Sequence, residues 1–159
     1  MWVAHVGRVP LLLLDSDVES NDSTRRGVTD RLYGGGVEDR LTQELLLGVG
    51  GVRALRAYTR IAKAPAPNVF HTNEGHAGFL GIERMRELIQ GHEGLNFAQA
   101  LEATRASTVF TTHTPVSAGI DRFPAELIRN CFTGEGSISH MPVDSIMALG
   151  LEPNGEFFN

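Results

Sequence analysis

The sequence predicts an α/β fold with parallel strands, because two short apolar runs of the same design flank a helical segment. The first run, residues 69–72, gives way to the polar turn 73–76, and the second, residues 109–112, gives way to His113. About 30 residues of helix-like sequence separate them, the length of a crossover between parallel strands. Ligands of open parallel sheets lie outside the carboxyl ends of the strands. The two histidine-containing turns are therefore expected to converge on one ligand site.

Composition narrows the class of protein. The 159 residues suit one domain or part of one, and a hydrophobic content of 42% suffices for a core, so disorder is not expected. A formal net charge of -5 argues against nucleic acid or an anionic membrane as the partner. The longest apolar stretch, residues 9–14, is too short to span a bilayer, and no signal-peptide pattern opens the chain.

Two reactive residue types each occur once. The single cysteine, Cys131, excludes an intramolecular disulfide, fits a reducing compartment such as the cytoplasm, and is expected to be a small buried apolar residue. The single lysine, Lys63, lies in an Ala/Pro-rich segment that predicts a surface loop. A Schiff-base lysine needs a desolvated or cationic pocket, which nothing around Lys63 supplies. No cofactor-binding residue is therefore expected.

The N-terminal quarter predicts a hairpin followed by loops. Residues 2–6 and 9–14 are two strand-like runs around a Gly-Arg turn. Residues 15–30 are polar and rich in turn formers. The tyrosine and three glycines of residues 33–36 predict a flexible loop.

Residues 37–58 show helical periodicity, with apolar side chains on one stripe. Gly48, Gly50 and Gly51 interrupt this stripe and together cost a helix about 3 kcal/mol relative to alanine. Either another backbone or a ligand approaches the glycines closely, or the segment is two helices with a break at 48–50. The stripe consists of Leu41, Leu45, Val52 and Leu55.

Two helices are expected between the parallel strands, at residues 76–90 and 97–106. Asn96 is a good N-cap for the second helix, and Gln99 occupies the capping-box position three residues later. These helices supply the crossover that the parallel arrangement requires.

Short elements follow the second strand. Pro124 suits the first turn of a helix that runs to Asn130. Residues 133–140 are rich in glycine and serine and are expected to be exposed, and residues 144–149 predict a last short helix. The adjacent phenylalanines at 157–158 indicate that the sequence is cut where another element begins.

His71, Glu74 and His76 form the densest polar cluster of the sequence. Histidine and glutamate are zinc ligands, but the spacing is not H-E-x-x-H and no third ligand is evident, so no metal site is predicted. A backbone-bonded histidine beside a solvated glutamate is a second interpretation. A site for a hydroxyl-rich ligand is favoured, because glutamate accepts hydrogen bonds and neutral histidine both donates and accepts them.

His113 alone is more consistent with a structural role. Its parallel with His76 makes a functional role as consistent as a structural one. Pro115 restricts Thr114 to extended geometry, so this turn is stiff and presents backbone groups at fixed positions. No nucleophile arrangement of the Ser/His/Asp or Cys/His type follows from the spacing, so no catalytic residue is predicted.

The glycine-rich loop before the long helix also has two interpretations. Backbone N–H groups of such loops bind anions, but the G-x-x-x-x-G-K pattern is absent, so a hinge or gate loop is favoured. The side chains that follow on the helix, Arg40, Gln43 and Glu44, suit an ordinary solvated face equally well. The gate-loop residues are Tyr33, Gly34, Gly35, Gly36 and Arg40.

Five ordered blocks of the sequence form a recognisable set: 6–11 (VGRVPL), 30–35 (DRLYGG), 43–55 (QELLLGVGGVRAL), 71–77 (HTNEGHA) and 108–116 (TVFTTHTPV). In these blocks the chain resembles the α-glucan (glycogen, starch, maltodextrin) phosphorylase family, most of all its shorter bacterial branch. The match covers nearly the whole chain and is weak only beyond residue 133. Gly36 departs from the pattern, because the family often carries an acidic residue there.

The resemblance implies a GT-B architecture with two Rossmann-like lobes, of which residues 1–159 would be an internal piece of the N-terminal lobe. In this family inorganic phosphate cleaves the terminal α-1,4-glucosyl unit of a glucan and yields glucose 1-phosphate. The cofactor is pyridoxal 5'-phosphate, and its lysine belongs to the C-terminal lobe. The isolated chain is therefore expected to be inactive, and the full-length enzyme could be a homo-oligomer.

The resemblance also assigns roles to individual residues. It implies that His113 contacts the glucosyl residue at the cleavage subsite, partly through its backbone, with Thr114 beside it. It implies that the loop 33–39 gates the catalytic cleft, with Arg40 at its edge. The residues expected to line the adjacent sugar pocket are Asn73, Glu74 and His76.

Two alternatives stay open. A nucleotide-sugar-dependent glucan synthase of the same architecture would carry a nucleotide-diphosphate site in its other half. A standalone glucan-binding module would need a core of its own and affinity for maltooligosaccharides without phosphate or cofactor.

Overall fold

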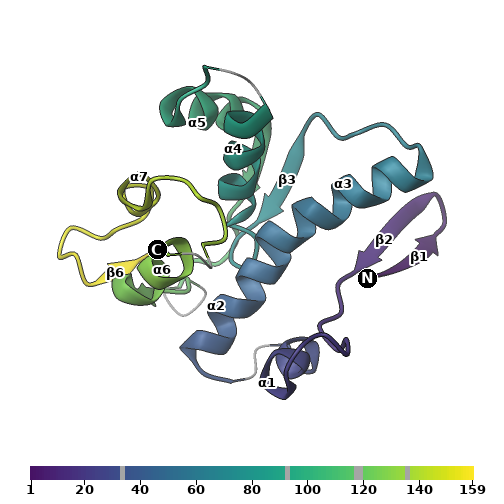
Figure 1. Cartoon of the computed structure of the whole chain (residues 1–159), viewed down its shortest axis with the longest axis horizontal. Helices are drawn as coiled ribbons and strands as arrows, with labels where there is room; N and C mark the ends of the chain where they lie inside the picture. Colours follow the sequence, from purple (N-terminus) through teal and green to yellow (C-terminus); the bar gives the residue numbers. More distant parts are fainter. Residues whose placement is uncertain (33–34, 92–93, 117–119, 135–136) are drawn as a thin grey trace.

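The computed structural model describes residues 1–32, 35–91, 94–116, 120–134 and 137–159. It is an α/β structure with three small two-stranded sheets in the described residues, of which one is parallel (Figure 1). No helix in these ranges is both long and apolar enough to cross a bilayer. The elements are β1 (Trp2–Val6), β2 (Val9–Leu13), α1 (Ser23–Arg26), η1 (Gly27–Thr29), α2 (Val37–Leu45), η2 (Leu46–Gly50), α3 (Gly51–Ala62), β3 (Phe70–Asn73), α4 (Leu80–Gly91), α5 (Phe97–Ala106), β4 (Thr108–Thr111), β5 (Phe123–Pro124), α6 (Ala125–Phe132), α7 (Val143–Met147) and β6 (Phe157–Phe158).

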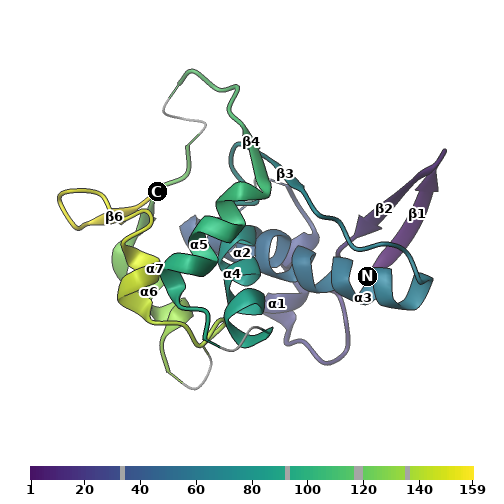
Figure 2. The same cartoon turned by 90° about the horizontal axis from the view of Figure 1, so that it is seen from above.

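The predicted N-terminal hairpin is confirmed. Strands β1 and β2 are antiparallel, and Val6 pairs with Val9 around Gly7, whose positive φ of 60° suits the tight turn. The hairpin stands apart from the helices (Figures 1 and 2). The segment 15–30, which was predicted to be rich in turns, also contains the short helix α1, whose N-terminus is capped by the Asp22 carboxylate accepting the Arg25 N–H.

The long helical segment is one continuous helix, so the alternative of two helices with a break was wrong. Helix α2 passes through the π-helical turn η2 into α3 without interruption (Figure 1). A Cβ on Gly48 would lie 2.7 Å from the Leu80 backbone nitrogen and 2.9 Å from the Phe79 carbonyl carbon. The close approach of another backbone therefore explains the glycine at this position.

The parallel strand pair with its helical crossover is confirmed. Strands β3 and β4 pair in register from Phe70–Thr108 to Asn73–Thr111, and α4 and α5 lie between them in the chain. Helix α4 begins at Leu80 rather than at 76, because Gly75 and His76 have the left-handed φ values 70° and 58° and cannot join a right-handed helix.

The capping prediction for the second crossover helix is also confirmed. The backbone N–H of Asn96 donates to Gln99 Oε1 at 2.9 Å, and the Gln99 N–H donates to Asn96 Oδ1 at 3.0 Å. This reciprocal pair satisfies two N–H groups at the start of α5.

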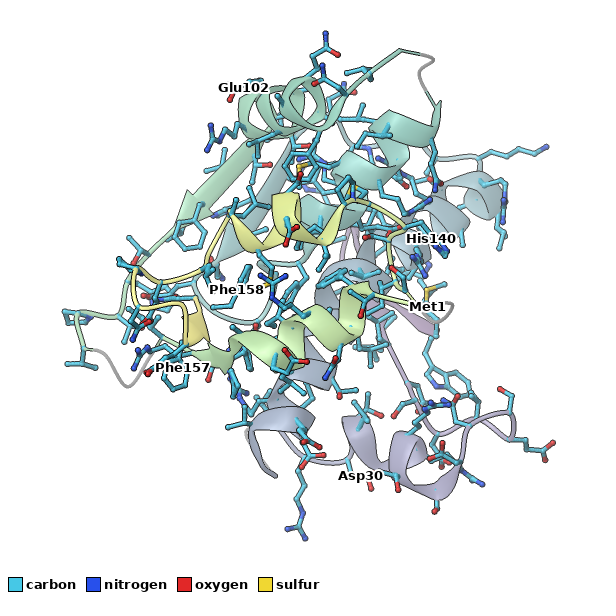
Figure 3. All side chains as sticks on the ribbon, turned by 60° about the vertical axis from the view of Figure 1, so that its left-hand side comes forward. Met1, Asp30, Glu102, His140, Phe157 and Phe158 are labelled. Carbon is cyan, nitrogen blue, oxygen red and sulfur yellow. The ribbon has the colours of Figure 1, made fainter. Side chains whose placement is uncertain are left out.

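The core joins the crossover helices to the C-terminal elements. The Phe79 ring lies 6.5 Å from Phe123, 6.1 Å from Phe132 and 6.3 Å from Phe158, measured between centroids. The Phe158 side chain is buried in the interior, whereas its neighbour Phe157 is only partly buried and lies near the surface (Figure 3). The last phenylalanine is thus a core residue held by the β5–β6 pair.

Three boundaries of the C-terminal part differ from the predictions. Helix α6 extends to Phe132, since that ring is buried against Phe79, and α7 covers Val143–Met147 rather than 144–149. In the segment expected to be exposed, Ser139 is only 1% exposed. Cys131 is half-buried at the edge of the core, where burial raises the pKa of its thiol.

A buried carboxylate ties α3 to α4. Glu83 is fully buried and accepts hydrogen bonds from Arg53 Nε at 2.9 Å and Arg86 Nη2 at 2.6 Å. Burial would raise the pKa of Glu83, but these arginine contacts outweigh it and lower the pKa. Helices α3 and α4 are therefore held together by ion pairs as well as by apolar packing.

Candidate functional site

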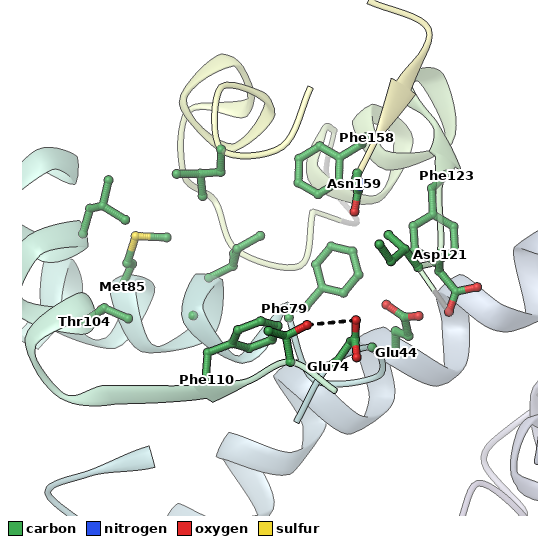
Figure 4. Close-up of a pocket in the computed structure, with 18 residues that line it drawn as sticks. Glu44, Glu74, Phe79, Met85, Thr104, Phe110, Asp121, Phe123, Phe158 and Asn159 are labelled. Atoms are coloured by element: carbon green, nitrogen blue, oxygen red, sulfur yellow. Dashed lines mark hydrogen bonds between the residues drawn. The ribbon is translucent and has the colours of Figure 1, made fainter. Parts of the chain in front are cut away.

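The turns that follow the two parallel strands meet, as the sequence predicts, and Glu74 joins them. Its carboxylate oxygen Oε2 accepts the backbone N–H of His113 at 2.9 Å and that of Thr114 at 2.6 Å. Its other oxygen, Oε1, accepts the Thr112 hydroxyl at 3.1 Å (Figure 4). The parallel pairing brings these groups together, because β3 and β4 end at the same edge.

Glu74 is held ionised by this arrangement. The backbone N–H of His113 is the largest cause, and with the Thr114 contacts it lowers the pKa of Glu74 to about 2 against the effect of burial. Only 8% of the Glu74 side chain is exposed. Its oxygens therefore serve the geometry of the His113 turn, and a sugar contact through Glu74 stays a prediction.

The imidazole of His113 is the group that this turn presents. Its side chain is 59% exposed, and Nδ1 lies 3.5 Å from Glu74 Oε2 and 3.2 Å from the Thr114 hydroxyl. Asn73 is exposed at the end of β3. These groups can donate to and accept from hydroxyl groups.

The sequence cluster of His71, Glu74 and His76 divides into three environments. His71 lies on the strand and hydrogen-bonds the Thr111 hydroxyl at 2.6 Å. Glu74 faces the second turn, and His76 faces a third region, occupied by Glu44. Strand alternation and the left-handed backbone at His76 send these side chains in different directions.

His76 lies with two carboxylates from other parts of the chain. One ligand atom each from His76, Glu44 and Asp121 lie within 4.8 Å of one another. Arg40 Nη2 is 2.5 Å from Asp121 Oδ2 and 3.9 Å from Glu44 Oε1. The solvated-face interpretation of this helix was wrong for Glu44, which is only 6% exposed. Burial first, and the Asp121 side chain next, raise the pKa of Glu44 to about 7.

A cavity of about 460 Å³ lies beside both groups of residues (Figure 4). Its walls are mostly apolar, including Phe79 and Met85, while Glu44, Glu74 and Asp121 supply polar groups. A second cavity of about 310 Å³ is lined by Arg40, Glu44 and His76 among others, so Glu44 borders both. An apolar cavity with a few convergent polar groups is typical of a small-molecule site.

The predicted gate loop is described only in part, because Tyr33 and Gly34 lie outside the described residues. Gly35 has a positive φ of 83°, and Gly36 is the N-cap of α2. The Gly36 N–H donates to Asp39 Oδ2 at 2.8 Å, so Asp39 supplies the carboxylate that caps this helix. Gating by this loop stays a prediction.

Sequence reasoning missed Asp121 and the role of the strand-end threonines. Asp121 pairs with Arg40 across 81 residues of sequence, and no spacing rule connects them. The burial of Glu44, by contrast, had a local signal, since it follows Leu41 by three residues on the apolar stripe of the helix.

The chain is similar in sequence to several curated proteins. No family model matches the chain. The chain is 58% identical over 165 aligned positions to "Glycogen phosphorylase" of Mycobacterium tuberculosis, covering 100% of this chain and 19% of that protein. It is 41% identical to "Maltodextrin phosphorylase" of Thermococcus litoralis (98% and 17%) and 31% identical to "Glycogen phosphorylase" of Aquifex aeolicus (100% and 22%). The chain thus spans about a fifth of the length of these curated relatives, and the predicted resemblance is confirmed along that segment.

Proposed function

We propose that this segment of an α-glucan phosphorylase forms one wall of a site at which inorganic phosphate cleaves a terminal α-1,4-glucosyl unit to give glucose 1-phosphate. The observation that carries the proposal is the 58% identity to a glycogen phosphorylase over the whole chain. The convergence of the two turns on Glu74 supports it, since it places the histidine-bearing blocks of the resemblance side by side.

The lobe assignment is part of the same proposal. The parallel pair β3–β4 with its crossover helices is compatible with an N-terminal Rossmann-like lobe of a GT-B enzyme. In this proposal residues 1–159 are part of that lobe, and the pyridoxal-phosphate lobe lies in the remainder of the protein. The whole enzyme would act in the cytoplasm.

Sugar recognition falls to the exposed groups of the two turns. The His113 imidazole, fixed through its backbone by Glu74, would hydrogen-bond the hydroxyls of the glucosyl unit. Thr114 and Asn73 would add polar groups beside His113, whereas His76 would contact the sugar from the side of Glu44, which it faces. An ionised Glu74 that does not move keeps this turn preorganised, which lowers the cost of binding.

The residues present do not fit pyridoxal phosphate. Lys63, the only lysine, is exposed at the C-cap of α3 and borders neither cavity. No step of the reaction is therefore assigned to a cofactor held by these 159 residues. That the chain alone is inactive stays a prediction.

Phosphorolysis tests the proposal directly. A longer protein containing this segment, supplied with pyridoxal phosphate, maltopentaose and inorganic phosphate, should release glucose 1-phosphate, whereas the 159-residue chain should release none. His113→Ala in the longer protein should lower kcat/KM at least tenfold, and Glu102→Gln on the exposed face of α5 should leave it unchanged. Absence of glucose 1-phosphate from the longer wild-type protein would refute the proposed activity.

A further inference from the structure

We propose that Glu44, His76 and Asp121 form a binding site for a divalent cation that accepts both nitrogen and oxygen ligands, such as Zn²⁺. The three residues come from three separate parts of the chain: helix α2, the turn after β3 and the segment before β5. Their ligand atoms already lie within 4.8 Å of one another. Carboxylates bind many divalent cations, but an imidazole ligand favours Zn²⁺ and related transition metals over Mg²⁺ or Ca²⁺.

A buried oxygen without a partner points to a missing ligand. Glu44 Oε1 is buried and has no hydrogen-bond partner among the described residues. Its nearest paired cation, Arg40 Nη2, is 3.9 Å away, beyond hydrogen-bond distance. A buried polar oxygen left in this state is costly, so a ligand at this position would relieve it.

The charges of the cluster favour a cation. Two carboxylates, the buried Glu44 and the partly exposed Asp121, lie close together, and Arg40 supplies one positive charge, chiefly to Asp121. The Arg40 contact uses Asp121 Oδ2. Arginine in this role orients a ligating carboxylate, as outer partners of metal ligands commonly do.

The dimensions require a small contraction. With metal–ligand bonds of about 2.1 Å in tetrahedral geometry, two ligand atoms on one Zn²⁺ lie about 3.4 Å apart. The ligand atoms of the cluster lie within 4.8 Å of one another, so side-chain rotation must close any pair that is wider than this. An entry path exists, because Glu44 borders both cavities.

The alternative for two close carboxylates is a shared proton. That arrangement involves Glu44 and Asp121 only, and it predicts neither metal affinity nor any dependence on His76. The metal proposal predicts both, so a binding experiment separates the two. It is independent of the proposed phosphorolysis, because it needs neither glucan nor phosphate.

The test is calorimetric titration of Zn²⁺ into the untagged chain at pH 7, after removal of metal by chelation and dialysis. Because thiolates also bind Zn²⁺, the background is Cys131→Ser. One equivalent should bind, and Glu44→Gln and His76→Ala should each weaken binding at least tenfold. The exposed control Glu102→Gln should not change it. In parallel, Zn²⁺ should raise the Tm of the background protein and not that of Glu44→Gln.

The proposal is overturned if no saturable one-equivalent binding occurs, or if Glu44→Gln and His76→Ala bind Zn²⁺ as tightly as the background protein. Should Glu44→Gln not fold, as its circular dichroism spectrum would show, His76→Ala decides alone. His76 lies on a half-buried turn outside the helices, so its truncation leaves the main packing intact.

Discussion

Gly48 and Gly51 lie three residues apart in the continuous helix α2–η2–α3, yet the structure predicts opposite effects of adding the same methyl group. A Cβ at Gly48 would lie 2.7 Å from the Leu80 backbone nitrogen, whereas one at Gly51 meets nothing within 4 Å. Ordinary Cβ contacts begin at 3.4 Å, so α4 must move away from the helix by several tenths of an ångström. The obstructing atoms are backbone, so a side-chain rotation cannot relieve the contact.

The expected magnitudes follow from two competing terms. Alanine stabilises an exposed helical position relative to glycine by about 0.5–1 kcal/mol, so Gly51→Ala should raise the free energy of unfolding by that amount. Gly48→Ala has the same gain but adds overpacking of about 1–3 kcal/mol, which leaves a net loss of up to about 2.5 kcal/mol. The two variants differ by the overpacking cost, so at about 2–4 °C per kcal/mol they should differ in Tm by roughly 2–12 °C.

The assay is urea unfolding followed by far-ultraviolet circular dichroism, with a thermal melt in parallel. The two variants share the helix, the residue type and the added volume, so each controls for the other. If Gly48→Ala were as stable as Gly51→Ala, the close approach of α4 to this helix would not exist as described, and the explanation of this glycine would fail.

Three further predictions concern charge and capping. Glu83→Gln should destabilise the chain by about 3 kcal/mol in urea unfolding, because it leaves the arginine partners of a buried carboxylate unsatisfied. The exposed control Glu102→Gln should change the free energy of unfolding by no more than about 0.5 kcal/mol. Equal effects of the two variants would contradict the buried network. Glu74→Gln should lower the Tm above pH 4.5, because the folded state holds the pKa of Glu74 below its ordinary 4.5. The difference in Tm from the wild type should vanish as the pH falls toward about 2. A difference in Tm that does not depend on pH would contradict this explanation. Asn96→Ala should cost about 1 kcal/mol through loss of the α5 cap, measured in the same unfolding assay, and an unchanged midpoint would show that the cap is not formed.

Local signals predicted those parts of the fold whose causes lie within a few residues. The α5 cap needs only Asn96 and Gln99, and the strand pair needs only two apolar runs and a crossover of suitable length. The start of α4 was missed because the left-handed backbone at His76 is unusual for a residue with a side chain and has no sequence signature.

The same distinction between local causes and tertiary contacts applies to the candidate site. The meeting of the two turns was predictable, because parallel strands end at one edge whatever else the chain does. The Glu44–His76–Asp121 cluster was not, because Asp121 reaches Arg40 across 81 residues and its position depends on the packing of Phe123 against Phe79. A residue pattern can therefore indicate which turns lie together, while the charged groups near those turns depend on tertiary contacts. The second turn illustrates this distinction. The sequence alone makes His113 a candidate site residue, and only the structure shows that the Glu74 carboxylate holds its backbone N–H.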